Sequence, residues 1–201
     1  MTNVQGLVMH PSLIAKTNPD KPAMIMAASG ERVTFGELEA RSNQGAQLLR
    51  KLGLKSGDGV AIFMENNIRF LEICWAAQRA GLYFTAISSR LTAGEVEYIV
   101  KDANAKVLIA GHTLAKVAGE VAPLIPGVKL LMVGGTIAGY ASYEEEASKM
   151  PATPIEDQIA GAAMLYSSGT TGRPKGVRQP LSGLPIDAPA PLLGLVTMLY
   201  G

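Results

Sequence analysis

Small, hydroxyl and cationic side chains are concentrated between Ser167 and Lys175, and this stretch is the strongest candidate for chemistry in the sequence. The ten residues after Tyr166 in LYSSGTTGRPKGV (165–177) include three glycines, four hydroxyl residues, an arginine and a lysine. Glycine lets the backbone bring its N–H groups close to a ligand, and the hydroxyls add further donors. Together with the Lys175 ammonium, such donors suit a polyphosphate. We therefore predict a phosphate-binding loop.

Other interpretations of the same stretch agree less well with its residues. The P-loop of the common nucleotide triphosphatases needs Gly-Lys-Ser/Thr in succession, whereas Pro174 precedes Lys175 and Gly176 follows it. A serine nucleophile would need a G-x-S-x-G elbow, which is absent, and the nearest histidine is His112. A hinge rich in Gly, Ser and Thr stays open, and Arg173 is either a second phosphate ligand or a solvated charge.

Strand-like apolar runs alternate along the chain with patterns typical of helices. Thr34 with Glu37, and Thr92 with Glu95, have the spacing of a capping box, which predicts a helix after each threonine. A hairpin is predicted around the turn pair Ser29-Gly30. The predicted strands span 59–64, 83–87, 106–110, 129–133 and 162–166, and the further helices span 68–80, 114–124 and 143–150. The predicted core positions on two of these helices are Phe70, Leu71, Cys74, Ala77 and Ala80, then Val96, Ile99, Val100 and Ala103.

This alternation predicts an α/β fold, with a mostly parallel sheet flanked by helices on both faces. Ligands of such sheets bind beyond the carboxyl ends of the strands. The strand at 162–166 should be buried and should deliver the loop that begins at Ser167 to such a place.

Composition excludes several other classes of protein. The formal net charge is +1, so no basic excess indicates nucleic-acid binding. One cysteine and two histidines make a zinc site of the usual kind unexpected, and we predict no metal ligands among the side chains. The sequence has no signal-peptide pattern and no apolar run long enough for a transmembrane segment. We expect a cytoplasmic protein.

The segment YSSGTTGRPKGV resembles the phosphate-binding loop of the adenylate-forming, or AMP-binding, superfamily. This superfamily includes acyl-CoA synthetases, luciferases and the adenylation domains of peptide synthetases. The stretch from Val33 to Ala110 is similar to the N-terminal region of the family along its whole length. The resemblance implies that the fold is part of the large N-terminal domain of such an enzyme.

A segment in the middle of the chain indicates the subfamily. AGLYFTAISSRLTAGEVEYIVKDA is similar to acid–CoA ligases, although Ser88-Ser89 stands where these usually have Asn-Pro before Arg-Leu-Thr. The Asp-Pro-x-Tyr-Pro stretch of peptide-synthetase domains is absent. The resemblance therefore favours a ligase for a fatty acid or an aromatic acid, with a fatty acid preferred.

The resemblance also implies a reaction in two steps. A carboxylic acid and ATP, accompanied by Mg²⁺, give an acyl-adenylate and pyrophosphate, and CoA then displaces AMP to form a thioester. No catalytic base is assigned, because the reacting carboxylate is already ionised. The residues implied in binding the β- and γ-phosphates are Ser167, Ser168, Gly169, Thr170, Thr171, Gly172 and Lys175.

The resemblance covers only the first part of the family's large domain. We expect residues 1–177 to form this partial domain, and 178–201 to be a proline-rich connector followed by the start of a truncated element. Because the adenine, ribose, CoA and acid sites of the family lie mostly beyond residue 201, the chain alone is not expected to turn over. The alternative is a non-catalytic nucleotide-binding or interaction module. An exposed domain face could also let two chains associate as a homodimer.

Overall fold

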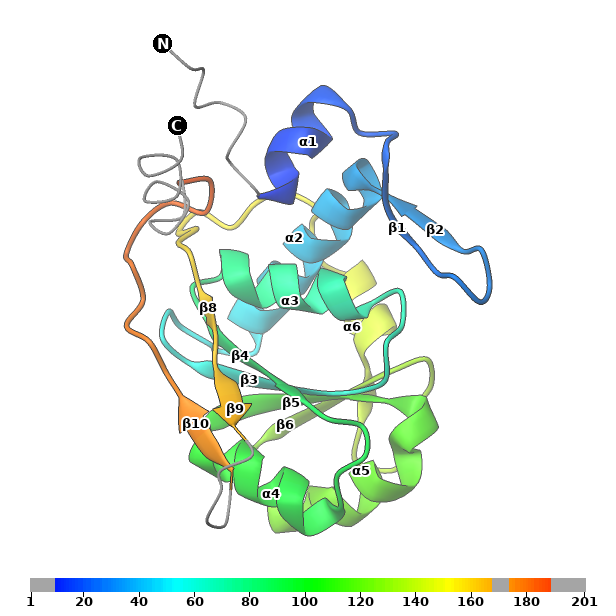
Figure 1. Cartoon of the computed structure of the whole chain (residues 1–201), viewed down its shortest axis with the longest axis vertical. Coiled ribbons are helices and arrows are strands. Elements are labelled where there is room, and N and C mark those ends of the chain that lie inside the picture. Colours follow the sequence, from blue (N-terminus) through cyan, green and yellow to red (C-terminus); the bar gives the residue numbers. More distant parts are fainter. Residues whose placement is uncertain (1–9, 168–173, 189–201) are drawn as a thin grey trace.

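A six-stranded sheet forms the centre of the molecule (Figure 1). The structure is a computed structural model that describes residues 10–167 and 174–188. Every neighbouring pair of strands in this sheet is parallel, and the strand order is β7-β6-β5-β3-β4-β8. The six strands are β3 (Gly59–Phe63), β4 (Tyr83–Ile87), β5 (Ala105–Gly111), β6 (Lys129–Val133), β7 (Ala141–Ser142) and β8 (Ala162–Ala163). The predicted α/β class with a mostly parallel sheet is confirmed.

Helices cover both faces of the sheet (Figure 1). One face carries α2 (Phe35–Lys51), α3 (Phe70–Arg79) and α6 (Tyr143–Ser148), and the other carries α4 (Ala93–Asp102) and α5 (Ala115–Val121). A further helix, α1 (Pro11–Thr17), packs on α2. Short 3₁₀ turns precede and follow α5, at His112–Leu114 and Ala122–Leu124. Two antiparallel hairpins complete the described structure, β1 (Pro22–Ile25) with β2 (Arg32–Thr34), and β9 (Leu165–Ser167) with β10 (Lys175–Val177).

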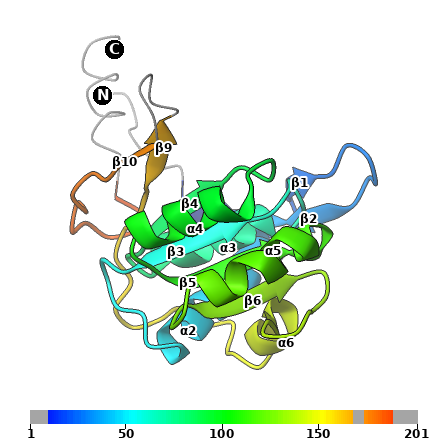
Figure 2. The same cartoon turned by 90° about the horizontal axis from the view of Figure 1, so that it is seen from below.

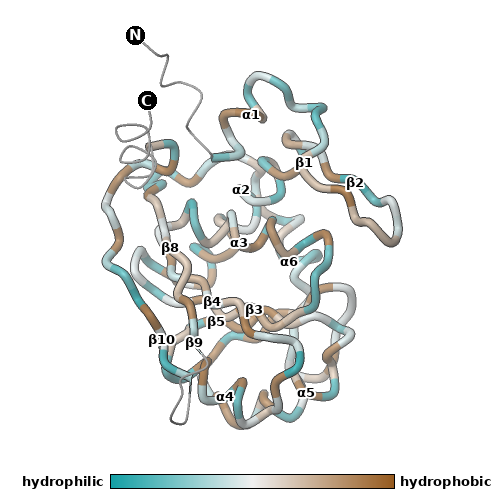
Figure 3. The backbone as a smooth tube through the Cα atoms, in the orientation of Figure 1, coloured by the Kyte–Doolittle hydropathy of each residue, from teal (hydrophilic) through white to brown (hydrophobic). Residues whose placement is uncertain are grey.

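Alternate residues of the central strands supply the two cores. Val60 and Ile62 of β3 point to the side of α2 and α3, whereas Ala61 and Phe63 point to the side of α4 and α5. Because both faces are covered, these strands are apolar at nearly every position. The flanking helices instead alternate hydrophobic and hydrophilic residues, which Figure 3 shows as changes of colour along each helix.

Local signals in the sequence set the starts of two helices as predicted. Thr34 accepts a hydrogen bond from the Glu37 backbone N–H at 3.2 Å, and the Glu37 carboxylate accepts one from the Thr34 backbone N–H at 2.9 Å. Thr92 and Glu95 form the second capping box, at the start of α4. The predicted inner face of α4 is confirmed, because Val96, Ile99, Val100 and Ala103 are all buried.

The prediction for α3 was partly wrong. Leu71 is 42% exposed rather than part of the core, and the buried positions of this helix include Ile73 and Ala76. The side of α3 that faces the sheet is thus rotated from the predicted one. Cys74 is a buried core residue as predicted, and burial raises the pKa of its thiol to about 12.

A cluster of buried polar side chains joins α1, α2 and α3. The guanidinium of Arg79, which is 1% exposed, donates two hydrogen bonds to the Glu39 carboxylate, at 2.6 and 3.1 Å, and a further short one to the Asn43 side-chain oxygen. His10 is also buried, and it contacts Trp75 edge to face with the ring centres 5.1 Å apart. The sequence analysis did not anticipate this cluster.

In the described part of the chain, no helix is long and apolar enough to cross a membrane.

Candidate phosphate-binding site

The candidate loop joins the two strands of the β9–β10 hairpin. Ser167 pairs with Lys175, Tyr166 with Gly176, and Leu165 with Val177. Ser167 and Lys175 therefore lie side by side at the base of the loop. The other residues predicted to bind phosphate, Ser168, Gly169, Thr170, Thr171 and Gly172, lie outside the described residues, as does Arg173.

The strand predicted at 162–166 differs from the expectation. It is divided into β8, which pairs with β4, and β9, which pairs only with β10. Met164, between them, is buried, but Leu165 is 65% exposed, so the loop does not follow a buried strand. β8 is the edge strand of the sheet on the β4 side, and β9 lies outside the sheet. Figure 2 shows the hairpin projecting beyond the β4 side of the sheet.

A second correction concerns Lys175. We expected this residue within an irregular loop, but it begins β10. The Met164 backbone N–H donates to the Phe84 carbonyl at 2.9 Å, and the chain then leaves β4 for the hairpin. The position of Lys175 is consequently set by its pairing with Ser167.

One face of the hairpin contacts α4. The Tyr166 hydroxyl donates a hydrogen bond to the Asp102 carboxylate at 2.6 Å. Gly176 lies opposite Tyr166, and a Cβ atom at this position would come within 2.4 Å of the Met164 methyl and 2.9 Å of the Tyr166 ring. A larger residue would therefore displace the Met164 and Tyr166 side chains from their positions. The inner face of the hairpin is therefore filled by Tyr166 packed over Gly176.

The other face of the hairpin points away from α4. Because side chains alternate along a strand, Ser167 and Lys175 lie on the face opposite to Tyr166. Both residues are exposed, as are Leu165 and Val177, their neighbours on this face. Within the described residues, Lys175 has no ion-pair partner. A cation and a hydroxyl group are thus presented together at the base of the loop.

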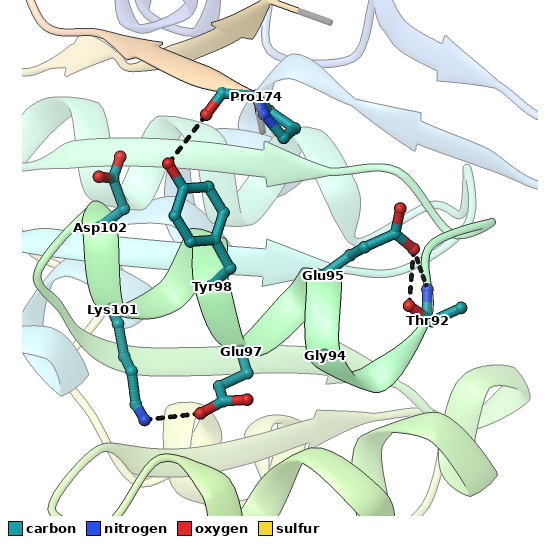
Figure 4. A pocket seen from close by; sticks show the side chains of 8 residues that line it. All are labelled: Thr92, Gly94, Glu95, Glu97, Tyr98, Lys101, Asp102 and Pro174. Carbon is teal, nitrogen blue, oxygen red and sulfur yellow. Dashed lines mark hydrogen bonds and ion pairs between the residues drawn. The ribbon is translucent and has the colours of Figure 1, made fainter. Parts of the chain in front are cut away.

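Pro174, which directly precedes β10, also contacts α4. The Tyr98 hydroxyl donates to the Pro174 carbonyl at 3.0 Å (Figure 4). Tyr98 and Asp102 are one turn apart on α4, with Asp102 the last residue of the helix. The hairpin therefore runs along α4 from the end of the helix toward its start. The start of α4 follows the carboxyl end of β4.

A hollow of about 830 Å³ lies along α4 and is bounded by Pro174 on the side of the hairpin (Figure 4). Among the described residues, it contains three carboxylates, of Glu95, Glu97 and Asp102, and one cation, Lys101, which pairs with Glu97 at 2.6 Å. Hydrogen bonds from the Thr92 side chain and backbone hold the pKa of Glu95 below its usual value, so this carboxylate is charged at neutral pH. Such a surface repels phosphate. Among the described residues, the hollow is therefore acidic, whereas the outer face of the hairpin carries the Lys175 cation.

The chain after β10 is fixed to the sheet. The Arg178 guanidinium lies 3.9 Å from the centre of the Tyr83 ring and donates to the Gly57 carbonyl at 2.7 Å. The Tyr83 hydroxyl donates to the Gln179 carbonyl at 2.6 Å. Both ends of the hairpin are therefore attached to the six-stranded sheet, one through Met164 and the other through Arg178.

Sequence reasoning missed the residues that hold the hairpin, above all Tyr98 and Asp102. One signal was available, since Tyr98 is an aromatic residue on the side of α4 away from its predicted inner face. An aromatic ring at such a position often covers another segment of the chain. No group of three or more acidic, histidine or cysteine side chains that could hold a metal ion occurs in residues 10–167 and 174–188.

Comparison with known proteins shows the family to which a chain with this fold and hairpin belongs. Residues 13–181 match the family described as AMP-binding enzyme, so the chain belongs to that family of adenylate-forming ligases. It is 30% identical over 174 residues to the fatty acid–[acyl-carrier-protein] ligase ScoC of Streptomyces coeruleorubidus, a match that covers 87% of this chain and 33% of the relative. It is 28% identical to the long-chain-fatty-acid–CoA ligase FadD13 of Mycobacterium tuberculosis, over 81% of this chain and 32% of that protein.

A solved structure shows the same arrangement of elements. The anthranilate CoA ligase AuaEII in complex with anthranoyl-AMP superposes with a TM-score of 0.72 at 25% identity, over 85% of this chain and 34% of the ligase. This chain therefore spans about a third of the length of the relatives that it matches.

Proposed function

We propose that this chain supplies the phosphate-binding hairpin of a ligase that activates a carboxylic acid with ATP and transfers the acyl group to a thiol. The observation that carries the proposal is the pairing of Ser167 with Lys175 on the exposed face of the hairpin, away from the acidic hollow. Membership of the AMP-binding family supports it.

In the proposed first step, the acid's carboxylate attacks the α-phosphate of ATP, forming an acyl-adenylate while the bond to pyrophosphate breaks. Negative charge builds up on the departing pyrophosphate. The Lys175 ammonium and the Ser167 hydroxyl bind the β- and γ-phosphates and stabilise this charge. Ser168, Gly169, Thr170, Thr171 and Gly172 are proposed to complete the set of donors. When bound with the nucleotide, Mg²⁺ neutralises further phosphate charge.

The proposed second step is attack of a thiol on the acyl-adenylate, which releases AMP and forms a thioester. CoA is the thiol that we prefer, and a fatty acid the acid, because two of the relatives carry fatty-acid ligase names. ScoC, named for an acyl-carrier-protein substrate, makes a protein-bound thiol the second choice. We also propose that residues 1–177 are part of the adenylating domain and that 178–201 are a connector, since the described residues 178–188 contain no helix or strand.

The class of acid can be tested by exchange of labelled pyrophosphate into ATP. In the protein that carries this chain, we expect exchange to depend on added acid and to be faster with a fatty acid than with benzoate. Exchange supported by benzoate but by no fatty acid would contradict the preferred substrate. Absence of exchange with every carboxylic acid tested would contradict the ligase activity itself.

Replacement of Lys175 with alanine tests the phosphate site directly. We expect the affinity for Mg·ATP, measured by calorimetric titration, to fall about 10- to 100-fold, because a charge-assisted hydrogen bond contributes about 1.5–3 kcal/mol. The melting temperature should not change, because the Lys175 side chain is exposed. Unchanged affinity at unchanged stability would remove Lys175 from the site.

Lys101→Ala is the matched control for this experiment. Lys101 is the cation inside the acidic hollow, on the other side of the hairpin. Its loss should leave the affinity for Mg·ATP unchanged. A decrease as large as that of Lys175→Ala would show that the phosphates bind on the α4 side, against the proposal.

A further inference from the structure

Helix α4 contacts the chain both before and after the candidate phosphate loop. The limb before the loop is held by the hydrogen bond from Tyr166 to Asp102, and the limb after it by the hydrogen bond from Tyr98 to the Pro174 carbonyl. The second contact lies directly before Lys175 in the sequence, and the first directly before Ser167. Each residue at the base of the loop therefore follows a residue that is fixed to α4.

Backbone pairing with the six-stranded sheet does not fix the direction of the hairpin. Among the described residues, the hairpin contains three residue pairs, and β9 pairs with no described strand other than β10. An isolated hairpin of this kind is marginally stable at best in water. The side-chain hydrogen bonds to α4, together with the packing of Tyr166 on the core, therefore hold the face that carries Ser167 and Lys175 away from α4.

The groups that form these two hydrogen bonds are suited to holding the hairpin in one position. Burial, then the hydrogen bond and charge of Asp102, raise the pKa of Tyr166 well above its usual value, so its hydroxyl keeps the proton that it donates. Pro174 has no backbone N–H, so its carbonyl is the only backbone group that it offers to a partner. Tyr98 binds that group.

We propose that Tyr98 and Asp102 are positioning residues for phosphate binding, which act by holding the hairpin against α4 so that Ser167 and Lys175 face away from the acidic hollow. This inference rests on the proposed function of the hairpin. Neither residue touches the phosphates. Loss of the Tyr98 contact turns the cation toward the carboxylates of the hollow or leaves it without a fixed direction. Loss of the Asp102 contact leaves the cation without a fixed direction, and each of these changes weakens binding.

The first experiment removes single hydroxyl groups. Tyr98→Phe is expected to weaken binding of tripolyphosphate about two- to tenfold, the range for one neutral hydrogen bond. Tyr140→Phe is the matched control, because the Tyr140 hydroxyl also donates to a backbone carbonyl, that of Ala118 at 2.9 Å, on α5. Tyr140→Phe should lose at least as much stability as Tyr98→Phe, because the hydrogen bond of Tyr140 is buried. Its affinity for tripolyphosphate should equal that of wild type.

The second experiment separates the hydrogen bond of Asp102 from its charge. Asp102→Ala and Asp102→Asn remove the same negative charge, and both gain the same electrostatic attraction for an anion. Only Asp102→Asn keeps an oxygen that can accept the hydrogen bond from Tyr166. We expect Asp102→Asn to bind tripolyphosphate about two- to tenfold more tightly than Asp102→Ala.

The Lys175→Ala protein distinguishes failure of this inference from failure of the proposed function. One outcome would overturn the positioning role and leave the phosphate site intact. In that outcome, Lys175→Ala binds tripolyphosphate more weakly than wild type, Tyr98→Phe binds it as tightly as wild type, and the two Asp102 variants have equal affinities. If the wild-type chain bound neither tripolyphosphate nor Mg·ATP, the phosphate site in this chain would be overturned, and the positioning role with it.

Discussion

Replacement of Arg79 with alanine is expected to lower the free energy of unfolding by about 3 kcal/mol, the lower end of the range for loss of one partner of a buried ion pair. Arg79 is 1% exposed and holds both oxygens of the Glu39 carboxylate. Its loss leaves that carboxylate and the Asn43 side chain without their shared donor. The Glu39 side chain keeps 23% exposure, so water can reach it and limits the effect.

The effect of Arg79 on Glu39 follows from their charges. Burial alone would raise the pKa of Glu39, but the hydrogen bond and the charge of Arg79 outweigh it and hold this pKa below its usual value. Without Arg79, the hydrogen bond from Asn43 still opposes burial, but the balance shifts toward the protonated acid. The destabilisation by Arg79→Ala should therefore shrink as the pH falls into the range where Glu39 is protonated in both proteins.

Urea denaturation at neutral pH measures the predicted change, and Arg41→Ala is the control. Arg41 also pairs with a glutamate, Glu37 at 3.4 Å, but its side chain is 31% exposed and that of Glu37 is 46% exposed. We expect Arg41→Ala to destabilise the protein by less than about 0.5 kcal/mol. A loss below about 1 kcal/mol in Arg79→Ala would show that the buried cluster contributes no more than a surface pair.

Lowering the pH is expected to destabilise the fold through His10. Burial, followed by the positive charge of Arg79, lowers the pKa of His10 from 6.5 to about 4, against weaker opposing effects of Glu39 and Asp187. Between these two values the unfolded chain binds a proton at His10 that the folded chain does not bind. The stabilisation is thus complete above about pH 6.5 and is lost as the pH falls toward 4.

The size of this effect follows from the two pKa values. At 1.36 kcal/mol for each pKa unit, the interval from 6.5 to about 4 corresponds to about 3 kcal/mol, of which about 2.5 kcal/mol should be lost by pH 4.5. We expect His10→Gln to be less stable than wild type at pH 7.5, because His10 caps α1 by accepting from the Ser12 N–H at 3.2 Å. By pH 4.5 this difference should have decreased by about 2.5 kcal/mol or changed sign.

Urea denaturation of the two proteins at pH 7.5 and 4.5 checks this prediction. Carboxylates that do not interact with His10 affect both proteins alike, so the change in their difference reports His10 together with its charged neighbours. His112→Gln is the control for replacement of a histidine, because His112 is exposed, and its stability at pH 7.5 should be close to that of wild type. A difference between wild type and His10→Gln that stays constant with pH would show that His10 titrates normally.

Features encoded by neighbouring residues could be predicted from the sequence. The two capping boxes and the apolar face of α4 depend on residues three or four positions apart, and the structure has all of them. The central strands were predictable for a similar reason, since burial on both faces makes each a short apolar run. Fold class followed from the order of these elements.

Features that depend on distant residues could not be predicted. Glu39 and Arg79 are 40 positions apart, and Tyr98 and Pro174 are 76 apart, so no local pattern connects either pair. The loop was recognised by its composition, but composition does not show that Lys175 pairs with Ser167, or that an acidic hollow lies behind the hairpin. Helix α1 was missed as well, because it is short and is stabilised by packing on α2.

The attachment of the hairpin has a mechanical consequence. Between Met164 and Arg178, the described contacts of the hairpin with the rest of the molecule include side-chain hydrogen bonds to α4, but none belongs to the ladder of the six-stranded sheet. A swing of β9 and β10 about these two fixed ends would break the bonds of Tyr98 and Tyr166 and leave every pair of parallel strands in register. The sheet therefore carries the hairpin without sharing a ladder of backbone hydrogen bonds with it.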